Sequence, residues 1–264
     1  MADITGTPGD DVLSGGADSD RITGLDGNDV LAGLDGNDDL NGGPGNDIAV
    51  GGRGSDTVAG EAGNDIIVWN NGDGSDLMDG GADADTQVVN GAVAQGDEFR
   101  ADAGADDAAV FQRVNLVPFT LTMENVETLD VRGLGGDDRF TVTDLSGTAI
   151  EQVVFRGGDG NDVLDAGAAT TPILAFGENG DDTLGGGSAN DLLSGGDGAD
   201  TIVFARGSGI DTVLDFHPGE DSLELRGFGD TVPLEFRSDD GSLVLDFGEG
   251  DLLVLNGVGD ALFG

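Results

Sequence analysis

The sequence predicts an all-β fold built from short parallel strands, and three observations predict it. Seven consecutive segments of nine residues start at Gly6 and run without a gap to Val68. In each segment the sixth residue is Asp and the eighth is a single apolar residue. Glycine supplies 50 of the 264 residues, and each glycine inside a helix would cost about 1 kcal/mol.

Each nine-residue segment is expected to form a six-residue turn followed by a three-residue strand. Glycine allows the tight turn, and the apolar eighth residue points from the strand into the interior. Two segments make one coil, and stacked coils lie about 4.8 Å apart as parallel strands. The segments are GTPGDDVLS, GGADSDRIT, GLDGNDVLA, GLDGNDDLN, GGPGNDIAV, GGRGSDTVA and GEAGNDIIV.

A second array follows later in the chain. GLGGDDRFT at 133–141 is a weak copy of the segment, GGDGNDVLD at 157–165 is a full copy, and three more copies occupy 177–203. Both arrays end alike, because an aromatic residue follows the last strand in each, Trp69 in the first and Phe204 in the second. We expect each aromatic ring to cover the final coil of its array.

The composition excludes several classes of protein. The chain has 53 acidic and 10 basic residues, a net charge of −43, which opposes binding to nucleic acid or anionic lipid. It has no Cys, which excludes disulfides and thiolate metal sites, and one His, which disfavours a Ser–His–Asp triad. It has no apolar run of about 18 residues that would span a membrane as a helix. Disorder is the alternative, but Leu, Ile, Val and Phe make up about 27% of the chain, enough for a core.

The regular aspartates require a cation. In the expected coil the Asp residues stack in two columns, and neighbouring carboxylates about 5 Å apart repel by about 3 kcal/mol at an effective dielectric constant of about 20. Calcium prefers six to eight carboxylate and carbonyl oxygens, which glycine turns supply, whereas magnesium demands octahedral geometry. No soft ligand for zinc or copper is present. The columns are Asp11, Asp29, Asp47 and Asp65 on one side and Asp20, Asp38 and Asp56 on the other.

The segments GGPGNDIAV, GGDGNDVLD and GGDGADTIV match the pattern GGxGxDxUx and resemble the repeats-in-toxin (RTX, hemolysin-type) calcium-binding nonapeptide. The resemblance covers 6–85 and 157–214. It implies a parallel β-roll, a β-helix-like solenoid, that holds several Ca²⁺ ions, roughly seven to ten. In that family each ion lies between turns n and n+2, bound by the carbonyls of positions two and four with the Asp of one turn. The stacked turn adds the carbonyls of positions one and three and its own Asp.

Carried onto this chain, the resemblance implies two sets of metal ligands. In the first array they are Thr7, Gly9, Asp11, Gly16, Asp18, Asp20, Gly24, Asp26, Gly27, Asp29, Gly33, Asp35, Gly36, Asp38, Gly42, Gly43, Gly45, Asp47, Gly51, Arg53, Asp56, Gly60, Ala62, Asp65 and Asp76. In the second they are Asp138, Gly158, Gly160, Asp162, Glu178, Gly180, Asp182, Gly187, Ala189, Asp191, Gly195, Asp197, Asp200, Arg206, Ser208 and Asp211.

Two departures from the pattern carry expectations. Leu25 and Leu34 replace the glycine of position two and are expected to bend the turn. Pro44 and Arg53 occupy position three, where only a carbonyl is needed, and should be tolerated.

The chain is predicted to have four regions: a calcium β-roll at 1–85, an interposed β-rich segment at 86–150, a second roll at 151–214 and a C-terminal region at 215–264. The interposed segment alternates apolar and polar residues, as in a wider coil or a small β layer, with a loop at 102–110.

The last region also alternates, with turn signals at 239–241 and 248–251, and predicts an antiparallel β cap over the open sheet edge. Its extreme end, Asp260–Phe263, resembles the uncleaved signal of type I secreted proteins. The first residues contain no Sec signal peptide.

Together these features predict a non-catalytic, extracellular calcium-binding protein that is unfolded inside the cell and folds on export. Its expected partners are calcium, the type I secretion machinery, and a surface polysaccharide or a second copy of itself. The alternatives are an extracellular effector or a pore-forming protein, although no membrane-active helix is visible. An enzyme with an unrecognised carboxylate site is least favoured, because the repeats begin at Gly6 and the family's enzymes carry a preceding catalytic domain. His217 is expected in a surface turn, and Trp69, Phe204, Phe216 and Phe247 in the core or cap.

Overall fold

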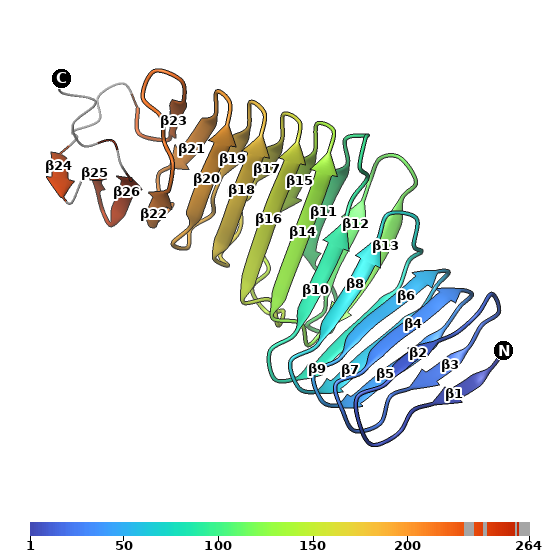
Figure 1. Cartoon of the computed structure of the whole chain (residues 1–264). Helices are drawn as coiled ribbons and strands as arrows, with labels where there is room; N and C mark the ends of the chain where they lie inside the picture. The colour runs from blue at the N-terminus through green and yellow to red at the C-terminus, as the bar shows by residue number, and fades with distance from the viewer. Residues whose placement is uncertain (230–234, 240–241, 257, 259–264) are drawn as a thin grey trace. The chain divides into compact units, whose positions relative to one another are not determined.

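The computed structural model describes residues 1–229, 235–239, 242–256 and 258. These residues contain strands and no helix, and they wind into a parallel β-solenoid (Figure 1), which confirms the predicted fold class. The chain divides into two compact units. The first comprises Met1–Gly91, Phe99–Arg132 and Leu145–Glu151, and the second comprises Ala92–Glu98, Gly133–Asp144 and Gln152–Gly264.

In the first unit the coils alternate between two sheets, here called sheet A and sheet B. The strands of sheet A, in spatial order, are β1 (Asp3–Thr5), β3 (Arg21–Thr23), β5 (Asp39–Pro44), β7 (Thr57–Ala62), β9 (Leu77–Ala82), β13 (Phe119–Glu124), β12 (Ala109–Arg113) and β11 (Glu98–Ala103). The strands of sheet B are β2 (Val12–Ser14), β4 (Val30–Asp35), β6 (Ile48–Arg53), β8 (Ile66–Asn70), β10 (Thr86–Asn90) and β14 (Thr128–Gly135).

The second unit repeats this arrangement. Its sheet A contains β15 (Arg139–Val142), β17 (Val163–Asp165), β19 (Thr183–Gly185), β21 (Thr201–Ala205) and β23 (Ser222–Arg226). Its sheet B contains β16 (Gln152–Asp159), β18 (Ile173–Asn179), β20 (Leu192–Asp197), β22 (Ile210–Val213), β26 (Asp251–Leu255), β25 (Ser242–Gly248) and β24 (Glu235–Asp239).

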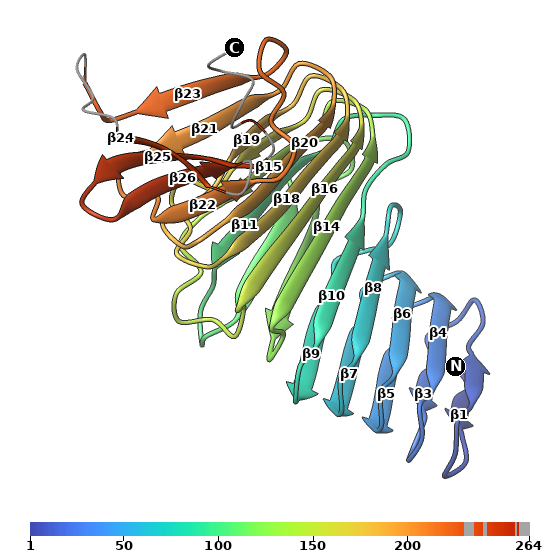
Figure 2. The same ribbon diagram turned by 60° about the vertical axis from the view of Figure 1, so that its left-hand side comes forward.

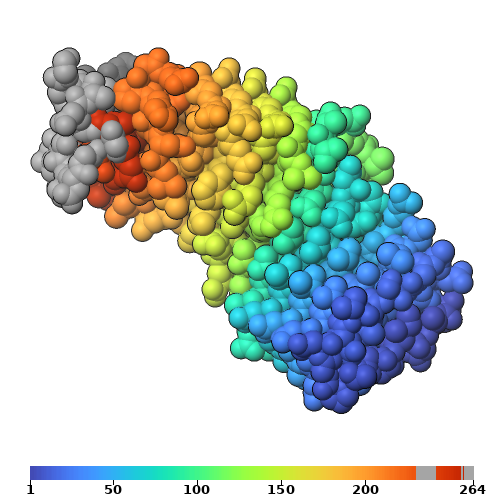
Figure 3. All heavy atoms as spheres, viewed as in Figure 1, coloured from blue at the N-terminus to red at the C-terminus, as the bar shows by residue number. Residues whose placement is uncertain are grey.

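The core follows the predicted eighth position of each segment. Leu31 and Ile67 of sheet B face Ile22 and Leu40 of sheet A, and all four side chains are buried. Parallel pairing in register stacks these residues directly, because each coil repeats the length of the one before it. Side chains fill the gaps that the ribbon shows between coils, as the all-atom view makes clear (Figure 3).

Trp69 does not end the first array, and the prediction that it covers the final coil is wrong. Strand β8, which contains Trp69, pairs in parallel with β10, so the coils continue. Trp69 and Asn70 form a two-residue insertion that lengthens the coil from 18 to 20 residues, as the bond from Asp65 N to Asp85 Oδ1 shows. The wider coil needs a larger filler, and the buried Trp69 ring stacks on Phe119 at 3.7 Å between ring centroids.

Phe204 fills a similar space in the second unit. It is buried, and its ring lies 5.1 Å from that of Phe247 and 5.9 Å from that of Phe228. One further strand of each sheet, β23 and β26, stacks beyond it, so Phe204 lies beneath the final coil instead of covering it.

The interposed segment forms strands, as predicted, but 102–110 is not a loop throughout. Strands β11, β12 and β13 are antiparallel neighbours in sheet A of the first unit. Asp102 pairs with Val110 and Ala103 with Ala109, so only the residues between these pairs turn. Ala101 and Phe111 bury their side chains on the same face, and this burial extends both strands into the predicted loop.

The C-terminal region is only partly the predicted antiparallel cap. Strands β24, β25 and β26 are antiparallel neighbours, and Glu249 and Gly250 form the predicted turn between β25 and β26. In contrast, β23 pairs in parallel with β21, and β26 pairs in parallel with β22, so these two strands continue the solenoid. Residues 240–241 of the turn signal at 239–241, and the terminal motif Asp260–Phe263, lie outside the described residues. Within the described part of the chain, no helix is long and apolar enough to cross a membrane.

Candidate metal centre

The turns of the repeat impose a left-handed backbone at position two and at position four. Position two has φ of 86° at Leu25 and 109° at Gly43, so leucine adopts nearly the same conformation as glycine. The expectation that Leu25 and Leu34 bend the turn is therefore wrong. Position four is more demanding, with φ of 148° at Gly45, a region that glycine alone occupies readily.

The turns of stacked coils contact each other through backbone N–H and carbonyl groups. The N–H groups of Leu25 and Gly27 donate to the carbonyls of Gly42 and Pro44 in the stacked turn, at 3.1 and 3.0 Å. The carbonyl oxygens of Leu25 and Gly27 lie against Gly43 and Gly45 of that turn. Pro44 is tolerated at position three, as predicted, because only its carbonyl is used.

The aspartates form the two predicted columns. One oxygen of each carboxylate accepts a hydrogen bond from the backbone N–H of the Asp in the preceding stacked coil; Asp29 N to Asp47 Oδ1 is 2.7 Å. These bonds fix the side chains and point them along the stack. The linked residues are Asp11, Asp29, Asp47, Asp65 and Asp85 in one column, Asp20, Asp38, Asp56 and Asp76 in the other, and Asp97, Asp138, Asp162, Asp182, Asp200 and Asp221 in the second unit, where Asp191 and Asp211 form a further pair.

The second oxygen of the interior carboxylates is buried and accepts no hydrogen bond. This holds for Oδ2 of Asp29, Asp38, Asp47, Asp56, Asp65, Asp76, Asp85, Asp138, Asp162, Asp182 and Asp200. An unpaired buried carboxylate oxygen is costly, and such atoms are rare in folded proteins. Eleven of them at one repeat position indicate a missing partner that carries positive charge.

Around most of the unpaired oxygens a backbone carbonyl of the stacked turn lies close by and offers a second oxygen ligand for a cation. A Cβ atom added to Gly42 would meet both Asp47 Oδ2 and, at 2.9 Å, the carbonyl oxygen of Gly60 in the stacked coil. The carboxylate and the position-one carbonyl of the stacked turn thus face one small space that only glycine leaves open. Hard oxygen donors of this kind suit Ca²⁺.

Burial raises the pKa of most of these carboxyl groups and of Asp191 and Asp211. For Asp182 burial is the main cause, nearby aspartates add to it, and the backbone N–H of Asp162 partly offsets it, which leaves the pKa at about 7. The Asp211 pKa rises furthest, to about 8. In the same way the pKa rises to about 7 for Asp76 and Asp138 and to about 6 for Asp47, Asp56, Asp85, Asp162 and Asp191. Near pH 7 a metal-free chain therefore keeps protons on part of these carboxyl groups, mainly those of Asp76, Asp138, Asp182 and Asp211.

The aspartates at the array ends are different. Asp11 and Asp20 use Oδ2 to accept the backbone N–H groups of Thr7 and Gly16 in their own turns, at 2.5 and 2.8 Å. Asp191 does the same with Gly187 at 2.6 Å. In the interior the position-two N–H donates instead to a carbonyl of the following coil, as Leu25 N does to Gly42 O, and Oδ2 is left without this donor.

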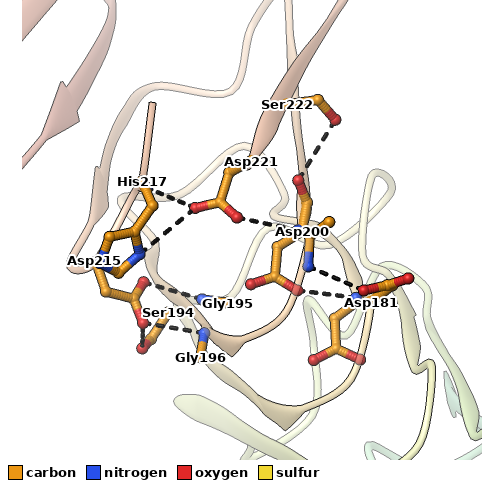
Figure 4. Close-up of polar contacts among 11 residues, drawn as sticks. Asp181, Ser194, Gly195, Gly196, Asp200, Asp215, His217, Asp221 and Ser222 are labelled. Carbon is orange, nitrogen blue, oxygen red and sulfur yellow. Dashed lines mark hydrogen bonds and ion pairs between the residues drawn. The ribbon is translucent and has the colours of Figure 1, made fainter. Parts of the chain in front are cut away.

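At the other end of the second unit, Asp215 replaces a missing coil. Its Oδ1 accepts the N–H of Gly195 at 3.0 Å, and its Oδ2 accepts the N–H of Gly196 at 3.0 Å and the Ser194 hydroxyl at 2.6 Å (Figure 4). In the interior of the array these N–H groups would bond to carbonyls of the next turn. Asp215 therefore caps the ladder of hydrogen bonds with its side chain.

Asp221 ends the sheet A column of the second unit. Its Oδ1 accepts the N–H of Asp200 at 3.0 Å, and its Oδ2 accepts the N–H of His217 at 2.6 Å (Figure 4). The His217 imidazole is exposed in a turn, as predicted, with Nδ1 4.0 Å from Asp221 Oδ2.

Not every predicted ligand contributes its side chain to the columns. The side chains of Asp18, Asp26, Asp35 and Asp197 are exposed, so only their backbone faces the stack. Arg206 donates to Glu249 at 2.8 Å on the surface. Among the described residues, no group of three or more His, Cys, Asp or Glu side chains is arranged to hold a metal ion.

The structure also adds residues that the sequence reading missed. Asp85 and Asp97 continue the columns, and Glu127 extends one of them by accepting the N–H of Asp85 at 2.7 Å. GGADADTQV at 80–88 is a further segment with Asp85 at its sixth position, and the polar Gln87 at the eighth hides it. The nine-residue pattern therefore continues after the two-residue insertion at Trp69.

Comparison with known proteins agrees with this geometry. The model of the RTX calcium-binding nonapeptide repeat matches residues 5–40, 41–68, 72–87, 154–169 and 176–212, half of the chain. The chain belongs to this family. Its repeats are therefore calcium-binding repeats, and secretion, including type I secretion, is consistent with membership.

No curated protein matches the chain in sequence. Among solved structures, the extracellular lipase LipA from Serratia marcescens is similar over 97% of this chain with 18% identity and a TM-score of 0.25. The chain spans 38% of the length of that lipase.

Proposed function

We propose that this RTX chain is a non-catalytic extracellular calcium-binding protein whose compact state depends on ions held between stacked turns. The observation that supports the proposal is the set of eleven buried Oδ2 atoms without a hydrogen-bond donor. Burying an unpaired charge costs several kcal/mol, and the columns repeat that cost in every coil. A divalent cation at each of these oxygens would remove it.

Each unpaired oxygen marks one candidate ion position, which suggests up to eleven ions against the roughly seven to ten expected from the sequence. The ligands would be the aspartate of one turn, the position-one carbonyl of the stacked turn, and neighbouring turn carbonyls. Bound calcium would supply positive charge that neutralises both aspartates of a stacked pair. The capped ends at Asp11, Asp20 and Asp191 need no ion at Oδ2.

The calcium gradient across a cell envelope would then control folding. At about 1 mM calcium and a dissociation constant of about 0.1 mM, each site contributes about 1.4 kcal/mol, and nearly nothing at cytosolic calcium levels. Seven or more sites add up to the stability of an ordinary domain. The chain would pass its exporter unfolded and fold at the cell surface or in the extracellular matrix.

Calcium titration of the purified full chain tests this proposal. Far-UV circular dichroism and hydrodynamic radius should report an expanded chain in chelator and a compact β-rich chain in millimolar calcium, with magnesium much less effective. Strand content and radius that do not change between chelator and calcium would contradict it. Absence of esterase and glycosidase turnover by the calcium-loaded chain would support the non-catalytic assignment, and turnover would overturn it.

A further inference from the structure

A hollow on the outer surface of sheet A in the second unit lies away from the aspartate columns. It has a volume of about 260 Å³, and its lining residues come mainly from β15, β17, β19, β21 and β23. The ribbon views show where these strands lie in the second unit (Figures 1 and 2). The walls of the hollow include Arg139, Asp165 and Arg226, and its floor includes Gly185 and Val203. The volume suits one small ring and is below the range of drug-sized pockets.

Gly185 creates this hollow. The ninth segment position forms one row across the five strands, and the residues that pair in that row are Thr141, Asp165, Gly185, Val203 and Glu224. Gly185 is the one member of the row without a side chain. The gap lies between Asp165 and Val203, where the pocket is found.

The backbone does not require glycine at this position. A Cβ atom on Gly185 would meet nothing closer than Val203 Cβ at 3.4 Å and Leu164 O at 3.6 Å, which are ordinary contacts. By contrast, a Cβ atom on the repeat glycine Gly177 would lie 2.5 Å from the Gly195 carbonyl. Gly185 has no left-handed φ. Glycine inside a strand weakens the strand, and it often marks a place where a ligand approaches the backbone.

The hollow is surrounded by positively and negatively charged groups that can form hydrogen bonds. Arg139 lies 3.7 Å from Asp165, measured from guanidinium nitrogen to carboxylate oxygen, and Arg226 donates to Glu224 at 2.8 and 3.2 Å. All four side chains are about half exposed, and the three that line the hollow, Arg139, Asp165 and Arg226, keep hydrogen-bonding capacity for a ligand. Their charges cancel. A neutral ligand with several hydroxyl groups, which both donate and accept, matches this lining.

Charged ligands fit the hollow less well. An anion would meet the field of a chain with net charge −43, and the two arginines are already paired with carboxylates. A cation would lie beside two guanidinium groups. Val203 and Ala205 provide a small apolar floor for the C–H face of a ring.

We propose that this hollow binds a single neutral sugar ring of a glycan. The proposal names a partner class for the extracellular role proposed above, and it depends on that role only in requiring a folded chain.

Saturation-transfer NMR on the calcium-loaded full chain tests the proposal, with glucose, galactose, mannose, xylose, rhamnose and N-acetylglucosamine as probes and galacturonate as the charged comparison. We expect transfer to at least one neutral sugar. Gly185→Val fills the hollow and should weaken binding by at least about tenfold, with Gly185→Ala intermediate. Ala59→Val is the matched control, because Ala59 occupies the ninth position of sheet A in the first unit, and it should bind like the native chain.

Circular dichroism and melting temperature in calcium establish that each variant is folded. Arg139→Gln provides a second variant if Gly185→Val does not fold, and it should also weaken binding. A folded native chain that transfers to no neutral sugar overturns the proposal. Transfer to galacturonate alone, or unchanged sugar affinity in both Gly185→Val and Arg139→Gln, overturns it as well. These results would leave calcium-dependent folding untouched, because every sample is folded in calcium.

Discussion

The interior of the arrays and their ends contain the same aspartate at the same repeat position in two different states. In the interior, Asp47 is buried, its Oδ2 has no donor, and burial raises its pKa to about 6. At the N-terminal end, Asp20 accepts backbone N–H groups from Ala2 and Gly16, and those bonds lower its pKa. The repeat motif alone therefore does not define an ion ligand. The state depends on whether a stacked coil has taken the donors that would otherwise satisfy the carboxylate.

The largest expected effect is on the metal-free chain as pH changes. The folded-state pKa values of nine buried repeat aspartates lie at about 6 to 8, above the value of about 4 in an unfolded chain. Between these limits the folded chain binds more protons, so its stability is greatest at low pH and falls as pH rises through 6 to 8. In chelator, strand content by circular dichroism should rise on acidification from pH 8 to about pH 4.5.

Calcium should remove most of this pH dependence above pH 7, because the bound ion replaces the proton. Strand content in chelator that falls steadily on acidification would show that the carboxylates are not buried as described.

The variants Asp47→Asn and Asp20→Asn compare an interior aspartate with one at an array end. Asparagine at position 47 keeps the acceptor for Asp29 N and removes the unpaired charge, so urea unfolding in calcium should show a loss of about 1.5 to 3 kcal/mol from weakened sites. In chelator at about pH 4.5, where the metal-free chain is expected to gain strand content, the same variant should be as stable as the native chain or more stable. Asp20→Asn should lose about 1 kcal/mol in both conditions, because it weakens bonds to backbone N–H groups. If the stabilities of Asp47→Asn and Asp20→Asn changed equally with calcium, the distinction between interior and end aspartates would be wrong.

The capped end of the second unit should respond independently of calcium. Asp215→Ala removes the acceptor for Gly195 N, Gly196 N and the Ser194 hydroxyl, and leaves two backbone donors unpaired. We expect a loss of about 1 to 3 kcal/mol in urea unfolding. The loss should be similar across a calcium titration; a loss that grows with calcium would mean that Asp215 is an ion ligand.

The smallest effect is expected at position two of the turns. Leu25→Gly relieves a left-handed backbone at φ 86° and should change stability by at most about 1 kcal/mol, with the sign favouring glycine. Gly45→Ala is the opposite test, since φ is 148° and the added Cβ would strike the Gly27 carbonyl. Thermal unfolding in calcium should therefore give Gly45→Ala a lower melting temperature than Leu25→Gly. A Gly45→Ala chain as stable as the native one would contradict the description of position four.

The sequence predicts the solenoid and the columns because both follow from a fixed period. A constant spacing stacks Asp29, Asp47 and Asp65 whatever else the chain does. Prediction fails where the spacing changes. The insertion at Trp69 suggested an end, and the widened coil with its Phe119 partner depends on contacts between residues far apart in sequence.

The end caps also could not be predicted from the sequence. Asp215 and Asp221 do not occupy a recognisable segment, and their roles appear only once β22 and β23 stack on the array. The sequence also does not reveal that the interior Oδ2 atoms are unpaired, because this depends on which acceptor the N–H of Leu25 and its equivalents bonds to.

Calcium anomalous scattering from crystals of the full chain tests the central claim most directly. We predict an anomalous peak beside Oδ2 of Asp29, Asp38, Asp47, Asp56 and the other interior aspartates, each shared with a carbonyl of the stacked turn. Carboxylates that turn outward into solvent, with no ion between successive coils, would contradict it.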